Sequence, residues 1–108
     1  MKTKRYINSL GCPIAIKRWS SCQNEDITYY LKPLWNSVHF AVVPTKNIQH
    51  NGLVHLPSSR LLVFSKLKIL KEIALELDDH EYIAFNIDNL PPSIRKGILD
   101  YICRRVTE

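Results

Sequence analysis

The chain has 108 residues, a formal net charge of +5 and 45% hydrophobic residues, which is the composition of a small globular domain. No apolar run reaches the roughly 18 to 20 residues that a membrane helix needs, and no apolar segment follows the basic N-terminus as in a signal peptide. We therefore expect a single domain over 1–108 in the cytoplasm, in which residues 1–11 could form a flexible basic arm.

Charge is divided unevenly along the chain. Residues 1–71 hold eleven Lys or Arg and two acids, a formal charge of +9, whereas residues 72–108 hold four bases and eight acids, a formal charge of −4. Six acids and no base lie between Glu72 and Asp88. The two parts therefore predict surfaces that attract partners of opposite charge.

The first half of the chain has the pattern of successive short strands. Apolar and polar residues alternate over 12–19 and again over 27–31 with polar turn residues between them, which predicts an antiparallel hairpin. Residues 38–43 are almost continuously apolar, which predicts a central strand covered on both faces. A short strand is expected over 53–56, before Pro57.

Residues 60–78 predict the longest element, a helix. Apolar residues recur along this segment at helical spacing, and Ser58 or Ser59 could cap its N-terminus. In an alternative interpretation residues 61–64 form a strand, because periodicity cannot separate the two structures over so short a run.

The C-terminal segment predicts one more strand and one more helix. Alternation over 82–87 predicts a strand with Ile83, Phe85 and Ile87 on its core face, and a proline start favours a helix over 92–106. The order is β-β-β-β-α-β-α, and the strands that flank the first helix would lie parallel through a right-handed crossover. We expect an α+β fold: a mixed, mostly antiparallel sheet of about five strands with two helices packed on one face.

No motif in the sequence identifies a chemical reaction. There is no Cys-x-x-Cys pair, no G-x-S-x-G elbow and no phosphate-binding glycine loop. Cys12, Cys22, His50 and His55 carry groups that bind zinc, but their spacing fits no compact zinc motif. We expect no metal and no cofactor, and the pattern favours a protein that is not an enzyme.

The acidic segment gives the leading hypothesis for function. Asp78, Asp79 and Glu81 lie where the first helix should end, and acids there oppose the helix macrodipole at roughly 0.3 to 1 kcal/mol each. Such acids indicate either a solvated surface or a patch used for binding. We expect a non-enzymatic protein-binding module, such as an inhibitor or immunity-type protein that neutralises a toxin or enzyme by direct contact. Its predicted contact residues are Glu72, Glu76, Asp78, Asp79, Glu81 and Asp88.

The cationic part supports a second hypothesis, an RNA- or DNA-binding protein. Basic residues could contact phosphates while neighbouring aromatic residues stack on bases. The residues predicted for this role are Lys17, Arg18, Trp19, Tyr30, Lys66, Lys68 and Lys71. A metal-independent ribonuclease is its enzymatic version, with His39 or His55 as an acid–base group. The sequence leaves open whether Trp19, Tyr29, Tyr30 and Trp35 are core or contact surface.

Overall fold

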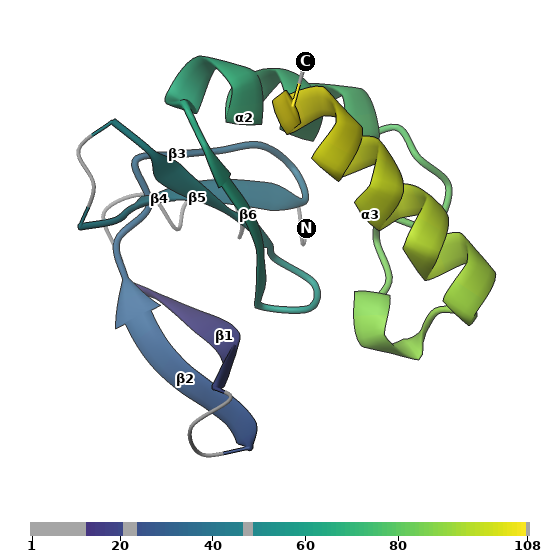
Figure 1. The fold of residues 1–108 in the computed structure, drawn as a ribbon, viewed down its shortest axis with the longest axis horizontal. Helices are drawn as coiled ribbons and strands as arrows, with labels where there is room; N and C mark the ends of the chain where they lie inside the picture. The colour runs from purple at the N-terminus through teal and green to yellow at the C-terminus, as the bar shows by residue number, and fades with distance from the viewer. Residues whose placement is uncertain (1–12, 21–23, 47–48, 108) are drawn as a thin grey trace.

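The computed structural model describes residues 13–20, 24–46 and 49–107, so the predicted arm over 1–11, Cys12 and Cys22 lie outside the described residues. The elements in chain order are β1 (Ile14–Ser20), β2 (Glu25–Leu31), β3 (Trp35–Asn36), β4 (Phe40–Pro44), β5 (Asn51–His55), β6 (Arg60–Ser65), α2 (Leu67–Leu77), the short 3-10 helix η1 (Ile87–Asn89) and α3 (Pro92–Thr107). They form the predicted α+β architecture, a mixed and mostly antiparallel sheet with two helices (Figure 1).

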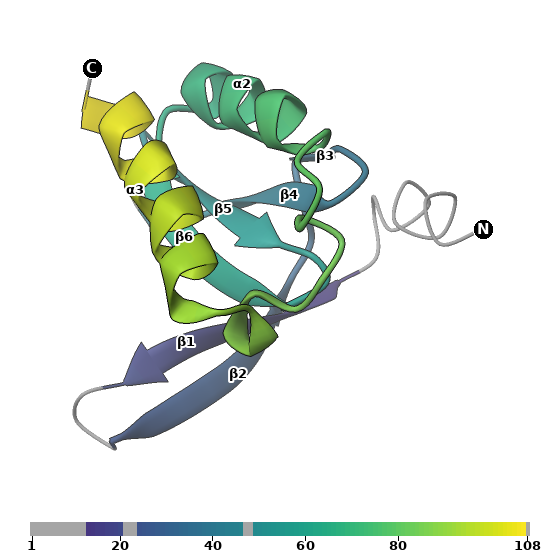
Figure 2. The same ribbon diagram turned by 90° about the vertical axis from the view of Figure 1, so that its right-hand side faces the viewer.

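The sheet is curled, and among the described residues the β1–β2 hairpin pairs with the other four strands at only one position. Its six strands follow the order β2-β1-β6-β5-β4-β3, and every neighbouring pair is antiparallel except β1 and β6. These two strands meet in parallel at the pair Lys17 and Arg60, where the Lys17 amide donates to the Ser59 carbonyl at 2.6 Å. The β1–β2 hairpin therefore projects from the sheet on the side away from α2 (Figure 1, Figure 2).

Successive residues of the central strands face two different cores. Val42 of β4 and Leu53 of β5 pack beneath the helices. Val43 and Val54, the next residues along each strand, pack with Ile16 of the hairpin. Both faces of β4 are thus buried, as the apolar run over 38–43 predicts.

Both helices lie on the same side of the sheet (Figure 2). The face of α2 that is buried consists of Leu70, Ile73, Ala74 and Leu77. In α3, which has the predicted bounds to within one residue, Ile98 and Ile102 are buried. Within the described ranges, neither helix is long and apolar enough to cross a membrane.

The predicted start of the first helix is wrong, and the alternative strand over 61–64 is confirmed. Residues 60–65 pair with β5 as β6, and α2 begins only at Leu67. Leu53 of β5 pairs with Val63 and Val54 pairs with Leu61, so Leu62 is an extra residue of β6 without a partner in β5. As a result, Leu61 and Phe64 lie on the same face of the sheet. This bulge replaces the two-residue spacing of a strand with the three-residue spacing of a helix. Ser58 and Ser59 accordingly form a turn and cap no helix, and Ser59 has φ 55°.

The predicted strand over 82–87 is also wrong. Residues 82–85 form turns, in which the Ile83 amide donates to the His80 carbonyl and the Phe85 amide to the Tyr82 carbonyl. Ile83 and Ile87 are buried as expected, but Phe85 is 56% exposed. Among the described residues, six strands therefore precede α2, and the parallel pair is β1 with β6 instead of two strands that flank α2.

Two leucines of α2 provide a test of this burial. Leu70 is fully buried against the sheet and Leu75 is 58% exposed. We expect Leu70→Ala to lower the free energy of unfolding by roughly 2 to 5 kcal/mol, because it leaves a cavity. Leu75→Ala should change it by less than about 0.5 kcal/mol. Urea unfolding followed by circular dichroism measures both, and equal losses would contradict this packing.

Candidate functional site

The segment between α2 and η1 carries the most distinctive surface of the described chain. We call residues 79–85 the 79–85 loop. It is attached to the protein on its inner side, where the Ile83 side chain is buried in the main core, and Ile87 at the start of η1 is buried there as well. Its outer side carries exposed acids and aromatic rings.

A buried histidine holds this loop in position. His55, at the end of β5, is 1% exposed, and its Nε2 lies 2.6 Å from the Ile83 carbonyl oxygen. A carbonyl only accepts, so Nε2 carries the proton and Nδ1 accepts from the Ser58 hydroxyl at 2.5 Å. Ser58 Oγ in turn accepts from the Ile87 amide at 2.8 Å. Burial lowers the pKa of His55 below its usual value, against the opposing effect of the bond to Ile83, which keeps the ring neutral.

Three rings follow one another along the outer side of the loop. The ring centroids of His80 and Tyr82 are 6.1 Å apart, and those of Tyr82 and Phe85 are 6.3 Å apart. His80 Nδ1 also accepts from the Tyr82 amide at 3.2 Å, which fixes the first pair. Asp79 and Glu81 are exposed beside these rings and form no ion pair with any described residue.

Two of the predicted contact acids bind α3 instead of remaining free. Glu76 accepts from the Tyr101 hydroxyl and from Arg105 Nε, the latter at 3.2 Å, and both interactions lower the pKa of Glu76. Glu72 lies 3.4 Å from Arg105 Nη2. Both carboxylates remain about half exposed. They join the two helices, so their main contacts are internal.

Asp78 has a structural role that explains an acid at a helix C-terminus. Its carboxylate accepts from the Ser37 hydroxyl at 3.1 Å and from the amides of Val38 at 3.3 Å and His39 at 3.1 Å. The β3–β4 turn thus presents N–H groups to the end of α2, and these stabilise a charge that the helix macrodipole disfavours. Asp78 is only 13% exposed, so it offers little surface to a partner.

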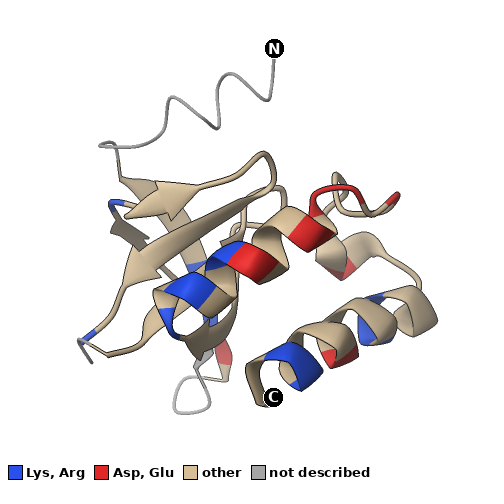
Figure 3. Ribbon diagram, turned by 90° about the horizontal axis from the view of Figure 1, so that it is seen from above, with Lys and Arg blue, Asp and Glu red and all other residues tan. Residues whose placement is uncertain are grey.

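Asp88 is also paired within the fold. Arg60 Nη2 lies 3.0 Å from Asp88 and 3.0 Å from Asp26, so one guanidinium joins η1 to the hairpin. The hydrogen bond from Arg60 lowers the pKa of Asp26. Figure 3 shows the acids along α2 and in the loop that follows it. The structure thus leaves Asp79 and Glu81 exposed and places the other four acids in internal contacts.

The residues predicted for nucleic-acid binding fall on two sides of the sheet. Lys66, Lys68 and Lys71 belong to the start of α2, and the Lys71 ammonium lies 5.7 Å from the Trp35 ring centroid. Arg18 belongs to the hairpin, where it lines a groove on the other face of the sheet. Lys17, its neighbour in β1, points to the opposite face of the strand.

The hairpin aromatics are divided in the same way. Tyr29 is half-buried beside the second core, whereas Tyr30 is 66% exposed. Trp35 packs partly against the main core, and the Trp19 side chain lies outside what the structure describes.

The structure excludes His55 as the acid–base group of the ribonuclease hypothesis. Both ring nitrogens of His55 are occupied within the protein and the ring is inaccessible, so it cannot reach a substrate. His39 Nδ1 lies 3.5 Å from Asp78. Among the described residues, no three His, Cys, Asp or Glu side chains gather as metal ligands would.

The sequence analysis does not predict Tyr82 and Phe85 as contact residues. Phe85 has the same spacing as Ile83 and Ile87, so the alternation over 82–87 predicts it on the core face, whereas its side chain is 56% exposed. No protein-family model matches the chain, and neither a curated protein nor a solved structure is detectably similar to it. The candidate site therefore rests on the geometry of the 79–85 loop.

The buried histidine predicts a pH-dependent stability. The unfolded chain binds a proton at His55 near the ordinary pKa of 6.5, whereas the folded chain keeps the ring neutral to lower pH. The unfolded state therefore binds more protons below pH 6.5, so this contribution is complete above that value and is lost as the pH falls toward the folded pKa.

Urea unfolding between about pH 5 and pH 8 should show a shallower pH dependence for His55→Gln than for the wild type. His50→Gln removes an exposed histidine and is the control, since it leaves His55 in place. Identical pH profiles for His55→Gln and the wild type would contradict the assignment.

Asp78 and Asp79 are adjacent acids with different surroundings, which allows a matched comparison. Asp78→Ala removes the acceptor for three hydrogen bonds and should cost roughly 1 to 3 kcal/mol of unfolding free energy. Asp79→Ala removes an exposed carboxylate and should stay within about 0.5 kcal/mol of the wild type. Chemical denaturation measures both, and a loss at Asp79 as large as at Asp78 would refute the internal role.

Proposed function

We propose that this chain is a non-enzymatic protein-binding module that uses the outer side of the 79–85 loop as its contact surface. The observation that carries the proposal is the row of Tyr82 and Phe85 rings beside two carboxylates without described ion-pair partners. Aromatic residues at the centre of an interface supply much of its binding energy, and charges around them select the partner.

The fixed inner side of the loop favours binding. An interface loop that must be ordered on association costs part of the binding free energy. Here Ile83, Ile87 and the His55–Ser58 hydrogen bonds already hold the backbone, so a partner meets a preformed surface. Phe85, at 56% exposure, offers an apolar anchor for a pocket on that partner.

Charge indicates the chemistry of the partner. Asp79 and Glu81 are exposed, and Glu72 and Glu76 keep about half of their surface open along α2. A partner with a basic surface would be attracted to this side of the molecule. An inhibitor or immunity-type protein that neutralises a basic toxin or enzyme by direct contact would act in this way, although the chain as a whole is positive.

Charge reversal tests the contact surface. Asp79→Lys with Glu81→Lys should weaken binding of a partner captured from the native host by roughly tenfold or more, because it places like charges together. Phe85→Ala should weaken it by more than about fivefold. Capture followed by titration calorimetry with the purified partner measures both effects, and circular dichroism checks that the variants are folded.

The matched control reverses two exposed acids elsewhere. Glu25→Lys with Asp100→Lys changes the net charge equally, on β2 and α3, and should leave the affinity unchanged. If the loop variants bind like the wild type, or if the control pair weakens binding as much, the contact surface lies elsewhere.

A further inference from the structure

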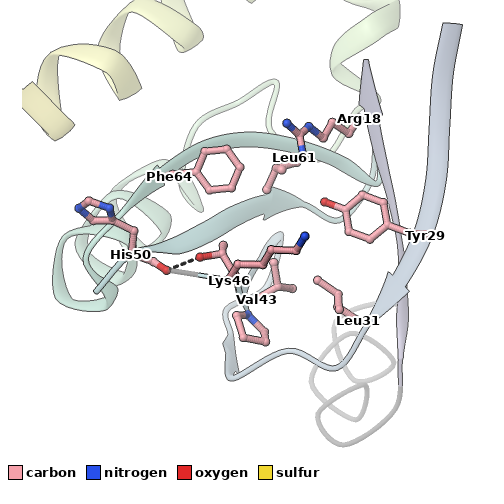
Figure 4. A pocket seen from close by; sticks show the side chains of 10 residues that line it. Arg18, Tyr29, Leu31, Val43, Lys46, His50, Leu61 and Phe64 are labelled. Carbon is pink, nitrogen blue, oxygen red and sulfur yellow. Dashed lines mark hydrogen bonds between the residues drawn. The ribbon is translucent and has the colours of Figure 1, made fainter. Parts of the chain in front are cut away.

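The other face of the sheet carries a groove that the proposed function does not use. It has a volume of about 790 Å³, within the range of ligand-binding pockets. Leu61, Phe64 and Val43 line it from the sheet, and Tyr29 and Leu31 line it from the hairpin (Figure 4). The groove exists because β1 meets β6 only at Lys17 and Arg60, beyond which the hairpin and the sheet diverge.

A glycine makes room for the side chains that line the groove. A Cβ added to Gly52 would lie 2.7 Å from Leu61 Cδ1, 3.3 Å from Val43 Cγ2 and 3.6 Å from Phe64 Cε1. These side chains therefore lie directly over the β5 backbone, which a larger residue would prevent. Phe64 remains 49% exposed, so its ring is accessible from the groove.

Two basic side chains, Arg18 and Lys46, line the groove. Arg18 comes from β1 and Lys46 follows β4, and Figure 4 shows them on opposite sides of Leu61, with the Tyr29 hydroxyl directed into the same space. None of the described residues that line the groove is acidic. Neither cation forms an ion pair with a described acid, and Asp26 on the hairpin is already paired with Arg60.

We propose that this groove binds single-stranded nucleic acid, with phosphates contacted by Arg18 and Lys46 and a base stacked on Phe64. Single-strand binders combine cations that follow the backbone with aromatic rings that stack on bases, and the groove offers both. The carboxylates of an acidic peptide would also pair with Arg18 and Lys46. They would not pack on the apolar side chains that line the groove, whereas a nucleic-acid base would. The excess of bases over acids in residues 1–71 favours a polyanion over a single anionic group.

The test measures fluorescence anisotropy of a labelled single-stranded oligonucleotide of roughly 8 mixed nucleotides, a typical site size for such binders. Parallel titrations use DNA and RNA of one sequence and show which of the two nucleic acids the groove binds more tightly. The wild type should bind at least one of them at low salt. In Arg18→Gln with Lys46→Gln the affinity should fall, and the slope of log K against log salt should become shallower by about 1.4, or 0.7 for each lost phosphate contact.

Phe64→Leu tests the stacking contact separately. It keeps an apolar side chain over Gly52 but removes the flat ring, and the affinity should fall roughly 5-fold or more. Thermal unfolding of each variant confirms that the loss does not come from a damaged fold. A duplex of the same sequence should bind more weakly, because its bases are already stacked on one another.

The matched control removes two cations from the helix side of the sheet. Lys66→Gln with Lys68→Gln lowers the net charge equally and should leave oligonucleotide affinity nearly unchanged. The proposal fails if no oligonucleotide binds at low salt, if this control pair loses as much affinity, or if duplex or a poly-glutamate peptide competes as well as the single strand. Asp79→Lys with Glu81→Lys should not weaken this binding, so the outcome is independent of the protein-binding surface.

Discussion

The His55–Ser58 network is the interaction on which the second half of the structure depends. His55 ends β5 and Ser58 lies in the following turn, yet their hydrogen bonds end on the backbone at Ile83 and Ile87. They satisfy two polar groups of a segment that has no strand or long helix of its own. Because burial without partners would cost each group roughly 1 to 3 kcal/mol, the loop is held where these partners are. A neutral imidazole suits this role, since it donates at one nitrogen and accepts at the other.

Four of the six acids between Glu72 and Asp88 make contacts within the fold, which restricts where binding charge can lie. Arg60 joins the hairpin to η1 through Asp26 and Asp88, and Arg105 joins α3 to α2. Asp78 fixes the β3–β4 turn to the end of α2. An acid-rich stretch of sequence is therefore not equivalent to an acidic patch. Once internal partners are taken into account, the carboxylates of Asp79 and Glu81 remain for the surface.

Sequence patterns predicted those elements in which the spacing of apolar residues matches that of a regular strand or a regular helix. The hairpin, β4, β5 and α3 all follow this rule, and the α+β class follows from them. The two errors arise where tertiary structure changes the spacing. The bulge in β6 gave a strand the spacing of a helix, and the buried pair Ile83 and Ile87 gave a turn segment the alternation of a strand.

The candidate surfaces were less predictable than the fold. Asp79 and Glu81 could be selected by charge, but nothing in the sequence separates them from Asp78, whose partners lie about forty residues away. Arg18 is among the residues predicted for nucleic-acid binding, whereas Phe64 is not, because the groove depends on how the hairpin diverges from β6. Such long-range geometry has no local signal.

The shortness of β3 affects how the sheet meets other chains. This edge strand has only two residues, Trp35 and Asn36, and follows soon after Pro33. So short an edge presents few unpaired backbone groups, which discourages the addition of a further strand. β2, at the opposite edge, is seven residues long and pairs with β1 alone among the described strands. Self-association by strand pairing would therefore begin at β2, and the charged residues Glu25 and Asp26 at its start oppose it.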